Sequence, residues 1–385
     1  MIYFDNSATT PVDSRVYNAM KPYFTDKFAN PSSIHLLGRE VNEDLAIARE
    51  NISKLINALP EEVIFTGSGT ESDNLALKGI AFALKNKGNH IITSSIEHKA
   101  VSETMKWLET AGFTVTYLPV DKKGTVDLSS LEKSINDNTI LISIMLANNE
   151  IGTIEPMKDV VNIAKPKNII VHTDAVQAIG KMKIDVNELG VDLLTFSGHK
   201  IYAPKGIGAL YIENSLKDKI VPLIHGGGQE YSIRSGTENV PYIIGLAEAC
   251  DIINKELDNE VKHTKAIRDK FEELLLKEIP DIYINGDVSN RVCNISNISF
   301  KYIEGEALMA YTPEICCSTG SACSSEEGPS HVLKAIGINP IDIHGTIRFS
   351  FGRFNRLEEV PRAVSLLKDS VAKLRKLSPL YNKNK

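Results

Sequence analysis

A cysteine near the C-terminus lies in a segment that is unusual for a buried thiol. The stretch STGSACSSEEGPSHVL (318–333) surrounds Cys323 with small and polar residues rather than branched aliphatic ones. A cysteine that serves only in packing normally has apolar neighbours. The thiolate is the nucleophilic form of this side chain, and a polar loop would let it approach a reacting group. We therefore expect Cys323 to act as a nucleophile.

A lysine and an aspartate each follow an apolar run that is typical of a buried strand. Lys200 comes after VDLLTF (191–196), and Asp174 follows NIIVHT (168–173). A partly desolvated lysine has a lowered pKa and can form a Schiff base. A carboxylate beyond a buried strand can hold a positive charge in place. Each residue also has an ordinary structural explanation, Lys200 as a loop ion pair and Asp174 as a helix cap.

A glycine-containing turn and a histidine occupy comparable positions. The turn TGSGTES (66–72) joins a strand predicted at 62–66 to a helix predicted at 71–85, and His98 follows HIITSSIE (90–97). Backbone N–H groups at the positive end of a helix bind phosphate. The turn matches neither G-x-G-x-x-G nor a Walker A loop. A plain turn with Thr70 as helix cap therefore explains this segment as well as a phosphate-binding turn does. A lone histidine at a strand end is more often structural.

Taken together, these four features match the requirements of one cofactor. Pyridoxal phosphate needs a lysine for covalent attachment, a carboxylate at its pyridine nitrogen, a phosphate cradle and a flat group against its ring. Lys200, Asp174, the turn at 67–70 and His98 provide these groups. A metal site explains them less well, because the histidines and aspartates lack ligand spacing such as H-E-x-x-H.

Strands that alternate with helices must position these residues. The alternation predicts an α/β architecture with a parallel sheet buried on both faces. In such sheets ligands bind beyond the carboxyl ends of the strands, where the candidate residues lie. The apolar runs fall at 62–66, 90–96, 139–146, 168–175, 191–198 and 208–215, and helical patterns at 71–85 and 98–112.

The C-terminal third has a different pattern. A long helical stretch at 242–278 precedes shorter strands at 281–286, 294–300, 315–318 and 346–351. This change predicts a second, smaller α/β domain. We expect a large domain at 15–258 and a small domain formed by 1–14 together with 259–385.

Bulk composition narrows the class of protein. The 385 residues are 42% hydrophobic and 24% charged, with a net charge of −6, as in ordinary globular proteins. The negative charge argues against nucleic-acid binding, and no apolar run is long enough to cross a membrane. Five cysteines do not suggest a disulfide framework, and the N-terminus lacks signal-peptide features. We expect a reducing, cytoplasmic location.

The motifs as a set resemble those of the NifS/IscS-type cysteine desulfurases. They occur in that family's order and span nearly the whole chain, from YFDNSATTP to LSPLY. The resemblance implies a fold-type-I pyridoxal-phosphate-dependent transferase, with a mostly parallel seven-stranded sheet in the large domain and a smaller α/β C-terminal domain. The matching segments are TGSGTESDN, NNEIG, HTDAVQA, SGHKIYAPKG, GGGQE, RSGTEN, GSACSS and IRFSFGRF.

The resemblance also implies an activity and partners. The family is homodimeric and converts L-cysteine to L-alanine, so the sulfur would remain on Cys323 as a persulfide. An iron–sulfur scaffold protein is the implied acceptor, and tRNA thiolation is a further implied destination. Transient sharing of an iron–sulfur cluster between Cys323 and such a scaffold stays open.

Individual residues take roles from the same resemblance. Lys200 is implied to carry the cofactor and to take the substrate α-proton, Asp174 to pair with the pyridine nitrogen, and His98 to stack on the ring. Asn149 and Arg348 are implied to bind the substrate carboxylate. On sequence alone, however, Arg348 in TIRFSF (346–351) looks like a surface strand residue. The other implied cofactor-binding residues are Gly69, Thr70, Gln177, Ser197, His199 and, from a neighbouring subunit, Thr237.

Two departures from the family pattern bear on the site. Ala203 stands where the family usually has glycine, and alanine would be strained there if the position requires φ > 0. The turn TGSGTES replaces the more common TSGATES, which leaves the phosphate contacts open.

Competing explanations stay open as well. An aminotransferase or a selenocysteine lyase of the same fold is one, and a non-catalytic protein that keeps the fold is another. A zinc site formed by Cys316, Cys317, Cys323 and His331 is a poor explanation, because the cysteines lack a C-x2-C pair. The remaining cysteines, Cys250 and Cys293, are expected in the core.

Overall fold

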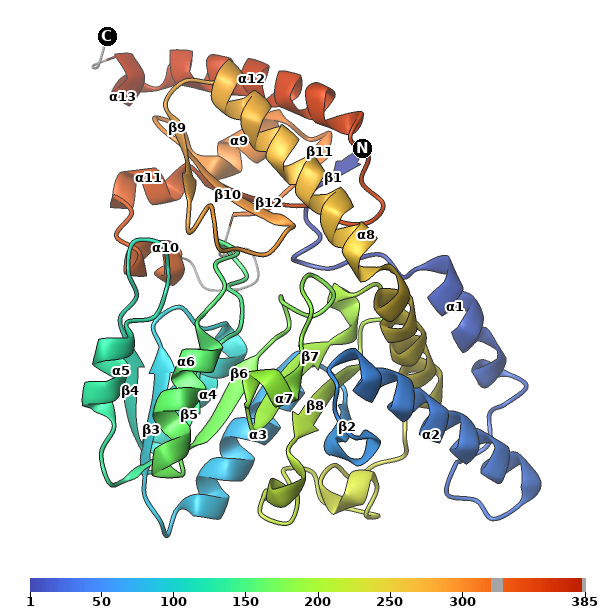
Figure 1. Ribbon diagram of the computed structural model, residues 1–385. Coiled ribbons are helices and arrows are strands. Elements are labelled where there is room, and N and C mark those ends of the chain that lie inside the picture. The colour runs from blue at the N-terminus through green and yellow to red at the C-terminus, as the bar shows by residue number, and fades with distance from the viewer. Residues whose placement is uncertain (320–327, 383–385) are drawn as a thin grey trace.

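The computed structural model describes residues 1–319 and 328–382 (Figure 1). A seven-stranded sheet occupies the centre of the larger part. β8 is antiparallel to both of its neighbours, and the other neighbouring pairs are parallel. The predicted α/β architecture with a mostly parallel sheet is confirmed. The strand order is β2 (Val63–Thr66), β8 (Gly208–Ile212), β7 (Leu193–Ser197), β6 (Ile170–Asp174), β5 (Thr139–Ser143), β3 (His90–Ser94) and β4 (Thr114–Leu118).

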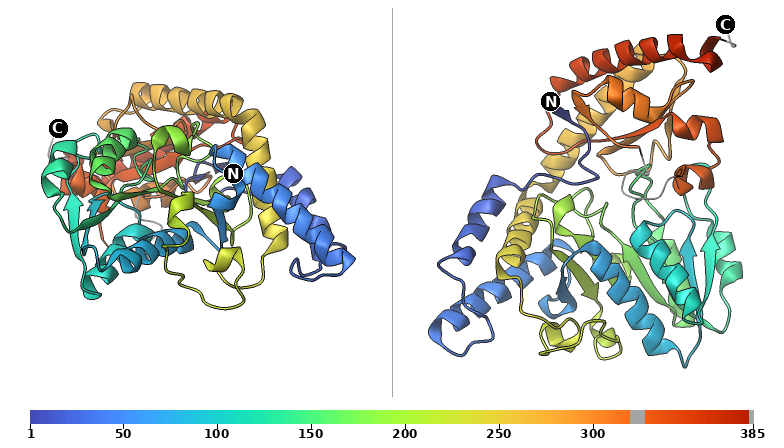
Figure 2. Two further views of the ribbon diagram at one scale, coloured as in Figure 1. Left: turned by 60° about the horizontal axis from the view of Figure 1, so that its bottom comes forward. Right: turned by 180° about the vertical axis from the view of Figure 1, so that it is seen from behind.

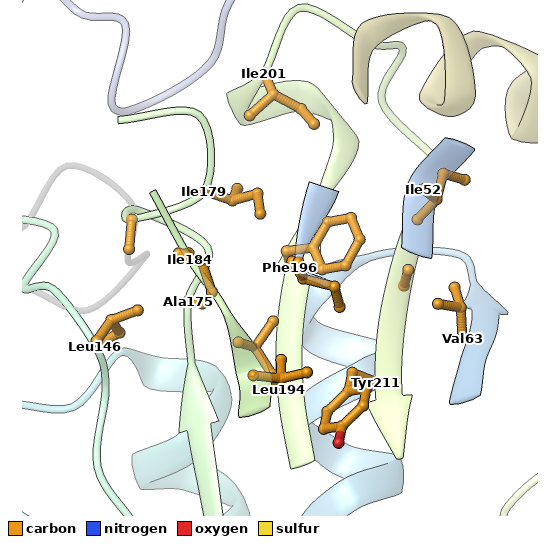
Figure 3. Packing of buried hydrophobic residues seen from close by; sticks show 14 of the residues in the cluster. Ile52, Val63, Leu146, Ala175, Ile179, Ile184, Leu194, Phe196, Ile201 and Tyr211 are labelled. Carbon is orange, nitrogen blue, oxygen red and sulfur yellow. The ribbon is translucent and has the colours of Figure 1, made fainter. Parts of the chain in front are cut away.

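Helices cover both faces of this sheet, which explains why most of its strands are almost entirely apolar. Successive strand residues point to opposite faces. Leu194 and Phe196 of β7 pack beside Tyr211 of β8 on one face (Figure 3), whereas Leu193 and Leu210 pack against α3 and α4 on the other. The helices are α1 (Ser14–Met20), α2 (Leu36–Leu55), α3 (Gly69–Leu84), α4 (Lys99–Thr110), α5 (Leu128–Ser134), α6 (Met157–Ala164) and α7 (Val186–Leu189).

Strand β4 lies at the edge of the sheet and is not apparent from the sequence. Its segment TVTYL has exposed side chains at Thr114 and Tyr117 and a buried one at Leu118. An edge strand does not need the continuous apolar run that marks a strand buried on both faces. Short 3₁₀ turns complete the part around the sheet: η1 (Lys21–Phe24), η2 (Pro60–Glu62), η3 (Lys165–Lys167), η4 (Gly198–Lys200), η5 (Asn214–Leu216) and η6 (Glu230–Ser232).

The smaller part is built from both ends of the chain. Its antiparallel sheet has the order β12 (Thr346–Ser350), β10 (Ile295–Phe300) and β9 (Ile282–Asn285). The N-terminal strand β1 (Ile2–Tyr3) pairs in parallel with β11 (Ile315–Cys316), so the start of the chain is part of the smaller sheet region (Figures 1 and 2). Its helices are α9 (Gly305–Tyr311), α10 (His331–Ala335), α11 (Pro340–His344), α12 (Glu359–Leu377) and α13 (Pro379–Asn382).

Helix α8 (Val240–Glu278) connects the two parts along its 39 residues. The long helix predicted at 242–278 is therefore confirmed. Its first half joins the apolar cluster of the large sheet, whereas its second half joins a separate cluster in the smaller part. The domain boundary expected at 258 falls inside α8 and stays a prediction.

Two observations bear on the composition-based expectations. Cys250 and Cys293 are buried, as expected for core residues. Within the described part of the chain, no helix is both long enough and apolar enough to span a membrane.

Candidate active site

A cavity at the carboxyl ends of β5, β6 and β7 brings most of the predicted site residues together. Thr237 is not among them, because it is exposed in the segment between η6 and α8. Cys323 lies outside the described residues. The predicted residues that line the cavity are Gly69, Thr70, His98, Asn149, Asp174, Gln177, Ser197, His199, Lys200 and Arg348.

The start of α3 forms one wall of the cavity. Ser68, rather than Thr70, is the helix cap, because its Oγ accepts a hydrogen bond from the Glu71 N–H at 3.1 Å. The first N–H groups of a helix have no intrahelical acceptor, so those of Gly69 and Thr70 suit an anion. The N–H of Gly67 already donates to the Glu71 carboxylate at 2.7 Å. The anion-binding part of the turn is therefore 69–70.

Gly69 also lets the helix start approach the neighbouring strand ends closely. A β-carbon at this position would lie 2.9 Å from a methyl group of Val176 and 3.3 Å from the β-carbon of Ser197. Any larger residue would push the N-terminus of α3 away from the cavity. The glycine therefore has a packing reason here, since its backbone does not have positive φ.

Asp174 is the last residue of β6, and only 5% of its surface is exposed. One carboxylate oxygen accepts a hydrogen bond from the Val176 N–H at 2.9 Å. Burial raises the pKa of Asp174 to about 6, although this N–H group and the charge of Lys200 act in the opposite direction. A cation placed against this carboxylate would be held strongly, because both charges lie away from water.

Lys200 ends the 3₁₀ turn η4, which follows β7. Its Nζ donates to the backbone carbonyls of Ser7 and Ala8, the latter at 2.8 Å. The side chain of Gln177 donates to the same Ser7 carbonyl at 3.1 Å. The N-terminal segment at 5–10, which we call the N-terminal strap, thus lines the cavity beside the lysine. Nothing in the sequence pattern indicated this contact.

The backbone after Lys200 shows whether alanine is strained at position 203. Ala203 does not have positive φ, so the strain expected for alanine is absent. The left-handed residue is Tyr202, with φ of 67°. Its N–H donates to the hydroxyl of Thr10 in the N-terminal strap at 2.9 Å, and its own hydroxyl accepts from the Arg353 N–H at 2.6 Å.

His98 is both a helix cap and a wall of the cavity. Its Nδ1 accepts the N–H of Ala100 at 3.1 Å, at the start of α4. Burial, helped by the charge of Lys200, lowers the pKa of His98 to about 4. The ring is therefore neutral at physiological pH, and its proton is on Nε2 because Nδ1 accepts. The same effects lower the pKa of His199 to about 4.

Arg348 on β12 is buried, with 1% of its surface exposed, so the surface position suggested by its sequence is wrong. Its guanidinium donates to the Asn149 carbonyl at 2.9 Å, to the Asp5 carboxylate at 3.1 Å and to the Ser318 hydroxyl at 2.9 Å. Its Nε has no hydrogen-bond partner within residues 1–319 and 328–382. Arg348 also lines the cavity, so a carboxylate ligand bound there can meet its guanidinium.

The comparison with protein families identifies the chain. The family model described as Aminotransferase class-V matches residues 2–362 of this chain. This chain belongs to the class-V aminotransferase family. Enzymes of this family use pyridoxal phosphate, and the fold is that of fold-type-I enzymes.

Similar proteins are known from both sequence and structure. A protein named cysteine desulfurase IscS from Dictyoglomus turgidum is 51% identical over 382 residues, covering 98% of this chain and 96% of the relative. Another of that name from Methanosarcina thermophila is 51% identical over 385 residues, covering 99% and 95%. A solved NifS-like protein is 41% identical with a TM-score of 0.91, covering 97% of this chain and all of the other. A solved structure of SspA in complex with cysteine is 39% identical with a TM-score of 0.82, covering 92% and 100%.

The donor set in the cavity fits pyridoxal phosphate. The helix start at 69–70 suits its phosphate, the buried Asp174 suits a protonated ring nitrogen, and Lys200 reaches the same space. Within the described residues, no group of three or more His, Cys, Asp and Glu side chains is placed to hold a metal ion. The lining also includes residues without a sequence signal, namely Ser7, Ala8, Ser68, Asp73, Met145 and Val176.

Proposed function

We propose that this chain is a pyridoxal-phosphate-dependent cysteine desulfurase that converts L-cysteine to L-alanine and leaves the sulfur on Cys323 as a persulfide. One observation carries the proposal. Lys200, Asp174 and the start of α3 line the same cavity as Arg348, and we assign them to its two opposite ends. This arrangement suits an amino acid, whose amine faces one end and whose carboxylate faces the other. The relatives named cysteine desulfurases support L-cysteine as that amino acid.

At the first end, which we call the cofactor end, the protein fixes the charges around the ring. When bound, pyridoxal phosphate supplies an electron sink for the bonds of the substrate α-carbon. Asp174 holds the ring nitrogen protonated, and Lys200 provides the attachment point and then takes the α-proton at Nζ. His98 lies against the ring as a neutral group. The remaining contacts to ring oxygen and phosphate come from Gln177, Gly69, Thr70, Ser197 and His199.

At the other end, which we call the substrate end, Arg348 and Asn149 bind the substrate carboxylate. The planar guanidinium fork can bond both carboxylate oxygens. Hydrogen bonds to the Asn149 carbonyl and to Asp5 hold its orientation before the substrate arrives. The carboxylate would thus meet a donor that is already fixed in place.

The chain on either side of residues 320–327 is anchored next to the cavity. Ser318 contacts Arg348 directly. On the other side, the Ser330 hydroxyl donates to Glu150 at 2.6 Å and the His331 ring lies 3.0 Å from the Glu97 carbonyl. These contacts support the proposal that Cys323 works at this cavity, because both ends of its segment start there.

The finer features of the proposal concern partners and location. We expect a homodimer in which the exposed Thr237 of one protomer completes the phosphate contacts of its partner. An iron–sulfur scaffold protein is the expected sulfur acceptor, tRNA thiolation is a further destination, and the expected location is the cytoplasm. Mixing a Thr237→Ala protein with a Lys200→Ala protein tests the shared site, since one site of the mixed dimer would regain its full set of residues.

The primary experiment measures alanine and sulfide released from L-cysteine with a reductant. We expect equal amounts from the wild type and loss of both from Cys323→Ala, which should keep the absorbance of its bound cofactor. The matched control is Cys316→Ala, which removes a nearby cysteine on β11. This variant should still release both alanine and sulfide. Unchanged release from Cys323→Ala would remove the role given to that thiol. Release of neither product by the wild type would instead favour the aminotransferase or the non-catalytic protein.

A further inference from the structure

A buried polar cluster lies next to Asp174, on the face of the large sheet that α3 covers. Asp73 of α3, His172 of β6, Thr195 of β7 and Ser143 of β5 are each at most 1% exposed. The His172 ring contacts the Ser143 hydroxyl at 2.9 Å through Nδ1 and the Thr195 hydroxyl at 3.1 Å through Nε2. The same Nε2 is 3.5 Å from Oδ1 of Asp73.

The sheet geometry places this cluster beside the carboxylate that faces the cofactor. His172 precedes Asp174 by two residues on β6, so the two side chains share one face. Thr195 is the register partner of Asp174 across β6 and β7. Asp73 lines the same cavity as Asp174. Two carboxyl groups therefore share one desolvated region.

Two carboxylates in such a region do not both ionise readily, because their charges repel and neither is solvated. The charge of Lys200 acts on Asp174 and favours its ionised form. Burial, together with the charges of Asp174 and Glu97, raises the pKa of Asp73 well above its usual range, although the Thr195 hydroxyl acts in the opposite direction. Burial also lowers the pKa of His172 to about 3, so the ring beside Asp73 is neutral.

We propose that Asp73 carries a proton at neutral pH and thereby keeps Asp174 the ionised carboxylate that pairs with the cofactor ring. Asp73 is a positioning residue in this scheme, since it acts through Asp174. The proposal deepens the function given above and rests on the role assigned there to Asp174. The ring nitrogen beside this carboxyl is Nε2 of His172, 3.5 Å from Oδ1 of Asp73, and the Thr195 hydroxyl contacts the same nitrogen at 3.1 Å.

The hydrogen-bond inventory agrees with this assignment. Oδ1 of Asp73 has no hydrogen-bond partner in the described part of the chain, although it is buried. An ionised oxygen left in that state is costly, whereas a protonated carboxyl brings no charge into the buried region. An ionised Asp73 would also push the proton onto Asp174, which would then no longer hold a protonated ring nitrogen.

The first test needs no cofactor and therefore stands apart from the proposed function. A carboxyl group whose pKa is raised above its ordinary value of 3.8 contributes stability that is present at low pH and lost as the pH rises. Asparagine resembles the neutral acid in shape but cannot ionise. In the cofactor-free protein, the Tm of Asp73→Asn minus that of the wild type should increase from about pH 5 to pH 8. A difference that stays constant with pH would overturn the proposal.

Glu155→Gln is the matched control for this measurement. Glu155 is also buried, with a pKa raised to about 8 by burial, and it does not line the cavity. Its substitution should produce a similar pH-dependent gain in Tm. The two variants should then differ in the second test, which reports on the site.

The second test follows the absorbance of the cofactor-loaded protein and kcat/KM against pH. Asp73→Asn should keep its activity to higher pH than the wild type does, moving the alkaline limb of kcat/KM upward by about 0.5–1 unit. Glu155→Gln should leave that limb in place. A loss of more than about tenfold at neutral pH with an unmoved limb would mean that Asp73 is needed as an anion, and would overturn the proposal.

Discussion

The cofactor end and the substrate end of the cavity are built in different ways. At the cofactor end, Asp174 and His98 each accept a hydrogen bond from a residue two positions ahead, although Lys200 reaches the N-terminal strap. At the substrate end the contacts of Arg348 cross the molecule, to Asn149 at a separation of 199 residues and to Asp5 at 343. Asp174 and His98 can therefore be positioned when the large sheet folds, whereas Arg348 needs the N-terminal strap and the smaller part in place.

The two ends also differ in charge. Burial shifts the pKa values of His98, His199 and Asp174 towards their uncharged forms. Arg348 is instead ion-paired with Asp5 while almost fully buried. At the cofactor end burial therefore suppresses the charge of these three side chains, whereas the substrate end contains a buried ion pair. Each prediction below changes one end and leaves the other as a reference.

The largest effect is expected at the cofactor end from Lys200→Ala. The variant lacks the amine that reaches the strap carbonyls and lines the cavity. Covalent retention of the cofactor after denaturation should disappear, and alanine release should fall by about 10³-fold or more. Circular dichroism controls for folding. Turnover above a tenth of the wild-type value would show that another group performs this role.

Arg348→Lys alters the substrate end alone. Lysine keeps the positive charge but loses the planar fork, so kcat/KM should fall by about 10–100-fold, mainly through KM. The absorbance of the bound cofactor should not change. Steady-state kinetics and a cofactor titration measure the two effects.

Arg375→Lys is the control for replacing a buried arginine. Arg375 is 3% exposed and donates to the backbone carbonyls of Pro280, Asp281 and Lys301, away from the cavity. The Arg375→Lys substitution should lower the Tm of the protein without lowering kcat/KM. Equal losses of kcat/KM in both variants would mean that Arg348 acts only through stability.

The difference between the cofactor end and the substrate end also explains which site residues could be predicted from the sequence. Asp174, Lys200 and His98 were identifiable because each follows an apolar strand, and an open sheet places such positions at one edge. The neighbouring Asp73 carried no such signal, since TESDN resembles the polar first turn of any helix. Arg348 looked like a surface residue because a five-residue strand does not show which face is covered.

The N-terminal strap shows most clearly which contacts cannot be predicted from the sequence. Ser7 contacts Lys200 across 193 residues, and the contact uses a backbone carbonyl rather than a side chain. Residue types reveal nothing about such a contact, because every residue has the same carbonyl. The motif YFDNSATTP supported the family resemblance, but its position beside the lysine required the folded structure.

A smaller effect is expected from Glu97→Gln, which tests how burial suppresses charge near the cofactor end. Glu97 is 1% exposed, and burial raises its pKa to about 8. Its contribution to stability is present below the unfolded value near 4.5 and is lost as the pH rises through about 8. The loss amounts to about 1.4 kcal/mol for each pH unit between those limits.

Glu97→Gln should therefore gain in Tm over the wild type as the pH increases from about 5 to 8. Thermal melts of the cofactor-free protein across this range provide the measurement. Glu103→Gln, on the exposed face of α4, should show a flat difference. A flat result for Glu97→Gln as well would mean that this carboxyl ionises in the folded protein, contrary to its burial.

The smallest effect is expected from Ala203→Gly, next to the cofactor end. If position 203 needed positive φ, glycine would relieve strain and raise Tm. Because Ala203 does not have positive φ, glycine should instead destabilise the fold by about 0.5–1 kcal/mol, through the greater freedom of the unfolded chain. Tm should fall by about 1–3 °C with kcat/KM unchanged.

A rise in Tm for Ala203→Gly would contradict the observed backbone. The left-handed position is Tyr202, whose conformation costs about 1–2 kcal/mol in a residue with a β-carbon. Packing of its ring under the Arg353 guanidinium, 4.1 Å from the ring centre, and the bond from the Arg353 N–H offset that cost. The turn that presents Lys200 is thus held by a residue from the smaller part. The cofactor end therefore depends on long-range contacts for its backbone as well as for Lys200 itself.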